Sequence, residues 1–68
     1  MIEFELKEEY IELIRLLKYL RLSETVGHAK IMVDEVMVVR NGEREFRRRA
    51  KIRKGDILEV EGEKIIIR

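Results

Sequence analysis

Apolar residues at the start of the chain first alternate with glutamates and then change to a helical spacing. In residues 1–6, Ile2 and Phe4 alternate with Glu3 and Glu5, which predicts a short half-buried strand at the edge of a sheet. From about residue 8 to residue 20 the spacing predicts an amphipathic helix. The apolar stripe of this helix contains Tyr10, Leu13, Ile14, Leu17 and Leu20. We therefore expect Tyr10 to lie in the hydrophobic core.

A second helix is predicted over the sequence TVGHAKIMVDE. Thr25 is the expected N-cap, because a threonine hydroxyl accepts a hydrogen bond from a free amide of the first helical turn. The apolar face of this helix contains Val26, Ala29, Met32, Val33 and Val36. Gly27 costs the helix about 1 kcal/mol relative to alanine. A close approach of the backbone to another element or to a ligand, a packing need, or chance explains that glycine equally well.

The second half of the chain predicts strands separated by tight turns. Met37 to Arg40 leads into Asn41-Gly42, a strong hairpin signal because a type I′ turn needs positive φ at both central residues. The later segments are a return strand over 43–47, a turn over 54–56, a strand over 57–60, a turn at Glu61-Gly62 and a strand over 64–67. The order β-α-α-β-β-β-β predicts an α+β fold, with two helices on a small antiparallel sheet and one domain over residues 1–68.

Composition limits the chemistry that the chain can perform. There is no cysteine and only one histidine, so we expect no disulfide, no structural zinc, no other metal and no cofactor. No stretch of about 18 apolar residues is present, which excludes a transmembrane helix. The acidic N-terminus is unlike a signal peptide. We expect a cytoplasmic protein with neither a membrane partner nor a small-molecule substrate.

Charge is strongly segregated although the net charge is only +1. Residues 1–14 contain five glutamates against one lysine, whereas residues 40–54 contain eight lysines and arginines against two glutamates. Residues 15–30 add four cations against one glutamate. This asymmetry predicts a folded protein with an acidic side and a basic side.

Three sequence blocks carry a resemblance to a known family. They are LIRLLK at residues 13–18, TVGHAK at 25–30 and NGEREFRRRAKIRKGDIL at 41–58. Their order resembles the αL motif and following hairpin of S4 RNA-binding domains, above all the small stand-alone S4 proteins of bacteria, over about residues 10–60. The resemblance implies an αL motif of two short helices and, as partner, structured RNA such as ribosomal RNA or tRNA, either free or within ribosomal particles. Glu12, Val36 and Arg40 depart from the family pattern, as do His28 and the Arg49-Ala50 pair.

The basic residues are the candidate RNA-binding site. Guanidinium groups are always charged and bind phosphate oxygens bidentately. The alternative is a solvated face that keeps a small protein soluble. The RNA-binding candidates are Lys18, Arg21, His28, Lys30, Arg44, Arg47, Arg48, Arg49, Lys51 and Arg53. Tyr19, on the polar side of the first helix, is a candidate for stacking on a base.

Other functions explain less of the sequence. No nucleophile or carboxylate pair accompanies His28, so we expect no catalytic residue and no enzyme activity. VVRNGER and KGDILEV also resemble strands of β-grasp carrier proteins, but the chain ends in Ile65-Ile66-Ile67-Arg68 without the Gly-Gly that those carriers use. A protein-interaction module with an acidic partner remains an alternative to RNA binding.

Overall fold

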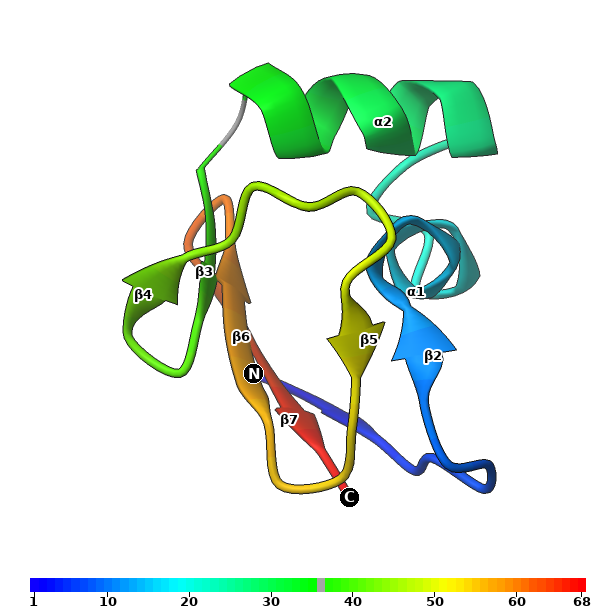
Figure 1. Cartoon of the computed structure of the whole chain (residues 1–68), viewed down its shortest axis with the longest axis vertical. Helices are drawn as coiled ribbons and strands as arrows, with labels where there is room; N and C mark the ends of the chain where they lie inside the picture. The colour runs from blue at the N-terminus through cyan, green and yellow to red at the C-terminus, as the bar shows by residue number, and fades with distance from the viewer. Residues whose placement is uncertain (36) are drawn as a thin grey trace.

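Two helices cover a five-stranded sheet in the computed structural model, which describes residues 1–35 and 37–68 (Figure 1). The helices are α1 (Leu13–Tyr19) and α2 (Val26–Glu35). The sheet has the order β1-β7-β6-β3-β4, and its strands are β1 (Ile2–Phe4), β3 (Val38–Arg40), β4 (Glu43–Arg44), β6 (Ile57–Val60) and β7 (Glu63–Ile67). A separate two-stranded sheet consists of β2 (Ile11–Glu12) and β5 (Lys51–Ile52). The α+β class agrees with the sequence pattern.

The main sheet is mixed, which corrects the expectation of a purely antiparallel sheet. The β1 strand lies at the edge and pairs in parallel with β7, with Ile2 opposite Ile65 and Phe4 opposite Ile67. The other pairs, β7 with β6, β6 with β3 and β3 with β4, are antiparallel. Alternation of apolar and polar residues determines which face of a strand is buried, but it does not determine the neighbouring strand.

The first helix begins at Leu13, so the prediction that it begins near residue 8 is wrong. Ile11 and Glu12 instead pair with Ile52 and Lys51 of β5. The first two amides of α1 then find backbone acceptors, since Leu13 N–H donates to the Ala50 carbonyl at 2.9 Å and Ile14 N–H to the Arg48 carbonyl at 3.2 Å. These carbonyls replace the side-chain cap that Glu12 does not provide.

The helix α1 ends in a backbone arrangement that normally favours glycine. Leu22 N–H donates to the Leu17 carbonyl and Arg21 N–H to the Lys18 carbonyl, both at 2.9 Å, which is a Schellman motif. Arg21 occupies its left-handed position with φ of 60°. The next helix begins as predicted, because Thr25 Oγ1 accepts a hydrogen bond from His28 N–H at 3.0 Å.

Both hairpin turns predicted from glycine pairs are confirmed. Asn41 and Gly42 have φ of 52° and 84°, and Glu61 and Gly62 have φ of 50° and 80°. The return strand is shorter than predicted, because β4 ends at Arg44 and an irregular segment over residues 45–50 leads to β5.

The core lies between the helices and one face of the sheet. Its largest fully buried side chains are Leu13, Leu16, Leu17, Val33, Val38, Ile52, Leu58, Val60, Ile65 and Ile67. Val36, which we expected on the apolar face of the second helix, lies outside the described residues. No helix in the described part of the chain is long and apolar enough to cross a membrane.

Candidate nucleic-acid interface

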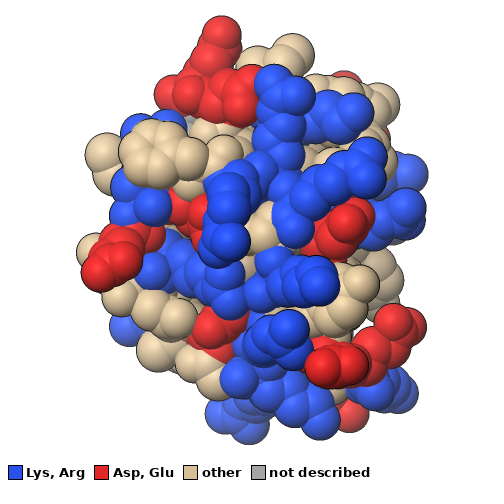
Figure 2. All heavy atoms as spheres, in the orientation of Figure 1, with Lys and Arg blue, Asp and Glu red and all other residues tan. Residues whose placement is uncertain are grey.

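Lysine and arginine side chains form a broad band on the face that carries β4, β5 and residues 45–50, which we call the basic face (Figure 2). Its centre is a shallow hollow of about 440 Å³. The residues that line this arginine hollow are Arg40, Arg47, Arg49, Ala50, Lys51 and Arg53. A second hollow adjoins it and is lined by Arg40, Asn41, Glu43, Arg44, Glu45 and Arg47. Anionic groups are therefore attracted to this face.

Arg40 lines both hollows, and its guanidinium contacts several neighbouring segments. Its guanidinium donates to Asp56 Oδ2 from Nε at 3.1 Å and from Nη2 at 2.8 Å, and Nη2 also donates to the Lys51 carbonyl at 2.7 Å. Nη1 lies 3.4 Å from Glu45 Oε1. The Arg40 side chain is only 20% exposed, and those of Asp56 and Glu45 are 13% and 10% exposed. Arg40 thus joins β3 to β5, to the turn before β6 and to the irregular segment.

Asp56 is the main acceptor in this network. It also accepts hydrogen bonds from the Arg53 amide at 2.8 Å and from Asn41 Nδ2 at 3.0 Å. Partial burial raises the pKa of Asp56, but these hydrogen bonds and the adjacent Arg40 charge outweigh the burial and lower the pKa below its ordinary value. Asn41 Oδ1 accepts from Ile57 N–H at 2.8 Å. The Asn-Gly and Gly-Asp turns are therefore joined by side-chain hydrogen bonds.

Arg47 and Arg48 are both paired with carboxylates. Arg47 Nε lies 3.2 Å from Glu45 Oε2, and the Arg47 side chain remains 73% exposed. Burial raises the pKa of Glu45, but hydrogen bonds from Arg47 and Arg40 and the Arg47 charge lower it overall. Arg48 pairs with Asp34 on α2, and its hydrogen bond lowers the pKa of Asp34. Arg48 is thereby directed toward α2 and does not line either hollow.

Tyr10 lies at the margin of the basic face, which corrects the expectation that it belongs to the core. It is 37% exposed. The Lys51 ammonium and the Arg53 guanidinium lie 5.0 Å and 5.8 Å from its ring centroid. Arg53 also lies 3.4 Å from Glu9. Tyr10 precedes β2 instead of belonging to a helix, so the helical stripe does not describe its surroundings.

The corner between the helices carries the remaining candidates. Lys18 is in the last turn of α1, Arg21 in the connecting loop, and His28 and Lys30 on α2. His28 helps to order this corner, because its Nδ1 accepts a hydrogen bond from Glu24 N–H at 3.2 Å. No ion pair between described residues involves Lys18, Arg21, Lys30 or Arg49.

Gly27 is not explained by crowding inside the described chain. A Cβ atom there would meet only Thr25 Oγ1, at 3.8 Å. This distance is ordinary van der Waals contact, so no neighbouring element requires a glycine. Neither close approach of another described element nor a packing need therefore explains the glycine, and approach to a ligand and chance stay as equal alternatives.

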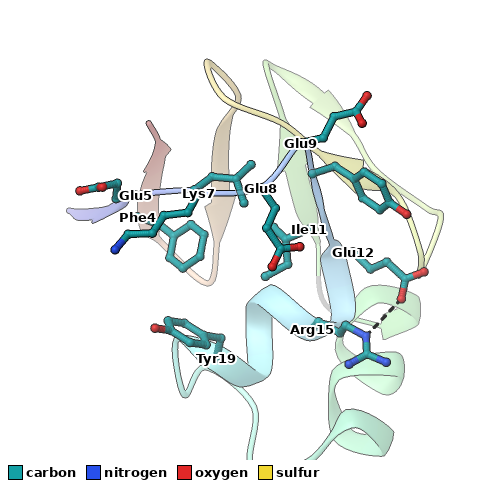
Figure 3. Close-up of a pocket in the computed structure, with 11 residues that line it drawn as sticks. Phe4, Glu5, Lys7, Glu8, Glu9, Ile11, Glu12, Arg15 and Tyr19 are labelled. Carbon is teal, nitrogen blue, oxygen red and sulfur yellow. Dashed lines mark ion pairs between the residues drawn. The ribbon is translucent and has the colours of Figure 1, made fainter.

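An acidic groove of about 740 Å³ lies between the N-terminal segment and α1 (Figure 3). Its acidic lining residues are Glu5, Glu8, Glu9 and Glu12. Arg15, which also lines the groove, pairs with Glu12 at 3.4 Å. Tyr19 is 71% exposed and packs edge-on against Phe4, with ring centroids 5.3 Å apart. The carboxylates around Tyr19 disfavour the approach of a phosphate, and hence of an RNA base, at that ring.

The structure brings only some of the predicted RNA-binding residues together around the two hollows. Arg47, Arg49, Lys51 and Arg53 line the arginine hollow, and Arg44 lines the adjoining one. Lys18, Arg21, His28 and Lys30 line neither hollow. Sequence reasoning missed Arg40, which we had treated only as a departure from an apolar family position. The sequence feature that could have indicated its role is an arginine at the end of a predicted strand, directly before the Asn-Gly turn. A carboxylate that could pair with it follows in the Gly-Asp turn.

Comparison with protein families identifies the family of this chain. The model of the S4 domain family matches residues 4–68, nearly the whole chain. A comparison with curated proteins gave no match. The family match includes all three sequence blocks that carried the resemblance and supports it over the β-grasp alternative.

Proposed function

Because the chain belongs to the S4 domain family, we propose that it is a non-catalytic domain that holds structured RNA on its basic face. Members of this family generally bind RNA, which supports an RNA partner in general. Within that class, we propose ribosomal RNA or tRNA, with a place in the cytoplasm and association with ribosomal particles. The α1–α2 corner acts in this proposal as an αL motif that contacts the same RNA.

The arginine hollow is the observation that carries the proposal. Five cationic side chains surround one hollow, and Arg40 holds its floor through hydrogen bonds to Asp56 and to the Lys51 backbone. Guanidinium groups match the geometry of phosphate oxygens, and a fixed floor reduces the entropy lost when RNA binds. A solvated basic face needs no such arrangement.

Recognition is expected to follow RNA shape and backbone instead of base sequence. The chain has no glutamine. The amide of Asn41 is engaged with Asp56 and Ile57, so it is not available to base edges. Phosphate contacts position a protein on nucleic acid but carry no direct sequence information. A selection that returned a tight linear sequence, independent of secondary structure, would contradict this expectation.

The test is the salt dependence of binding to a short RNA hairpin, measured by fluorescence anisotropy. Contact with about five phosphates gives a slope of log affinity against log salt of about −3.5 to −4.5. Replacing Arg47, Arg48 and Arg49 together by alanine is expected to flatten the slope by about 1.4 to 2.7, which corresponds to two or three contacts. Arg49 forms no ion pair between described residues, whereas Arg47 pairs with Glu45 and Arg48 with Asp34, so folding should change by at most about 1 kcal/mol for each replacement.

A charge-matched control separates specific phosphate contacts from general attraction. Replacing Arg15, Lys64 and Arg68 by alanine removes the same charge, but none of these residues lines either hollow. The control should retain the wild-type slope. Replacing Glu3, Glu5 and Glu8 by glutamine should leave binding equal or stronger. If the arginine triple variant and the control behave alike, the basic face is a solvated surface and the proposed site is wrong.

A further inference from the structure

Phe46 is an exposed aromatic residue at the side of the basic face. It is 69% exposed and follows β4 in the irregular segment that leads to β5. The Arg44 guanidinium lies over its ring, 4.8 Å from the centroid. An exposed phenylalanine contributes little to folding, since a phenylalanine side chain is stabilising mainly when it is buried. What distinguishes Phe46 is how its backbone is held and which charges surround it.

The backbone on both sides of Phe46 is anchored. Glu45 N–H donates to the Val38 carbonyl at 2.8 Å, and Arg47 N–H donates to Glu45 Oε2 at 3.1 Å. The Glu45 side chain is nearly buried and pairs with both Arg40 and Arg47. Phe46 is therefore presented from a fixed segment although its ring is exposed. A segment whose backbone is already held loses little conformational entropy when a flat partner stacks on its side chain.

The charges around Phe46 suit a nucleotide. Arg44, whose guanidinium lies over the ring, and Arg47, the next residue in the chain, line the hollow that adjoins the arginine hollow. Arg44 Nε is buried and has no hydrogen-bond partner among the described residues. Glu45 is already paired, and Glu43 is the other carboxylate of that hollow. An aromatic face flanked by guanidinium groups binds an unpaired base by stacking and its phosphates by charge.

The other aromatic residues with exposed rings are less suitable. Tyr10 is only 37% exposed and lines the acidic groove together with four glutamates. Tyr19 is exposed but lines the acidic groove, where carboxylates repel a phosphate (Figure 3). Phe46 alone among these three combines cationic neighbours with a mostly exposed ring outside the acidic groove, and Arg44 contacts that ring without covering it.

We propose that Phe46, backed by Arg44, is a stacking platform for one unpaired base of the bound RNA. This inference rests on the proposed function and narrows the substrate class. The ligand is an RNA stem that adjoins an unpaired nucleotide, with the stem phosphates in the arginine hollow and the unpaired base on Phe46.

The experiment compares two RNAs that share one stem. One is a blunt hairpin, and the other carries a single unpaired 2-aminopurine nucleotide beside the stem. The wild-type protein should bind the second RNA about fivefold or more tightly than the first, the lower end of what one stacked base contributes. Stacking should also quench the 2-aminopurine fluorescence.

Variants that differ in the aromatic face identify the platform. Phe46→Leu should bind both RNAs with the affinity that the wild-type protein has for the blunt hairpin, and it should not quench the probe. Phe46→Trp should keep both the preference and the quenching. Tyr19→Leu is the matched control, because it removes an equally exposed ring from the acidic groove, and it should behave as wild type.

The outcomes separate this inference from the proposed function. If the wild-type protein binds neither RNA, the proposed function is wrong and the platform is wrong with it. If it binds the blunt hairpin but shows no preference, or if Phe46→Leu keeps the preference and the quenching, only the platform is wrong. If Phe46→Leu instead converts a dimer into a monomer in sedimentation experiments, the ring contacts a protein and the platform is again wrong.

Discussion

Replacing Arg40 by methionine removes the guanidinium that joins three segments of the basic face but keeps an apolar stem of similar length. In the wild-type protein this guanidinium donates two hydrogen bonds to Asp56 and one to the Lys51 carbonyl, and it lies 3.4 Å from Glu45. Asp56 and Glu45 would then remain largely buried with one cation fewer. The variant is therefore expected to unfold more readily.

The size of the expected stability loss depends on which hydrogen bonds and ion pairs Asp56 and Glu45 keep in the variant. Breaking a fully buried ion pair costs about 3–5 kcal/mol. Asp56 retains the Arg53 amide and the Asn41 side chain, and Glu45 retains Arg47. Loss of hydrogen bonds to charged groups that keep other donors costs less, so we expect the free energy of unfolding to fall by about 2–3 kcal/mol.

Urea unfolding followed by circular dichroism measures this loss. With a slope of about 1 kcal/mol per molar urea for a chain of this size, the midpoint should fall by about 2–3 M. Arg15→Met is the matched control, because Arg15 pairs with Glu12 on the surface with its side chain 72% exposed. Arg15→Met should lower the free energy of unfolding by less than about 0.5 kcal/mol. Equal midpoints for the two variants would show that the Arg40 network does not stabilise the fold.

Two further predictions concern pH and the α1–α2 corner. Because the folded-state pKa values of Asp56 and Glu45 lie below the ordinary 3.8 and 4.5, their contribution to stability is present above those values and is lost as the pH falls through the folded pKa values. The urea concentration at the midpoint of unfolding should therefore decrease as the pH is lowered below about 4.5, and it should decrease less in Arg40→Met. A midpoint that stays constant down to about pH 3 would contradict this prediction. Arg21→Gly should stabilise the fold by about 0.5–1 kcal/mol, because φ of 60° suits glycine, yet weaken binding to the RNA hairpin. Arg21→Ala should weaken binding without stabilising the fold, and equal stability of the two variants in urea would show that no strain is present.

Sequence patterns alone determined the features that depend on neighbouring residues. The turns at Asn41-Gly42 and Glu61-Gly62 were predicted because positive φ is a local property of these residue pairs. The second helix was predicted with its cap, since Thr25 reaches an amide only three residues away. The family resemblance was likewise carried by local blocks, and the match over residues 4–68 confirmed it.

Tertiary structure alone decided the features that depend on partners distant in sequence. The start of α1 and the position of Tyr10 follow from pairing of residues 11–12 with β5 and from the Arg48 and Ala50 carbonyls. The parallel pairing of β1 with β7 likewise follows from the path of the whole chain.

The candidate site shows the same division. Composition identified the cations of the basic run, but not which of them share a hollow. Arg47 and Arg49 line the arginine hollow, whereas Arg48, between them in sequence, pairs with Asp34 on α2. The role of Arg40 depends on Asp56, which comes within hydrogen-bonding distance only when β3 pairs with β6. Periodicity gives the face on which a side chain lies, but an ion pair needs two atoms within a few ångströms, and only the folded chain determines that distance.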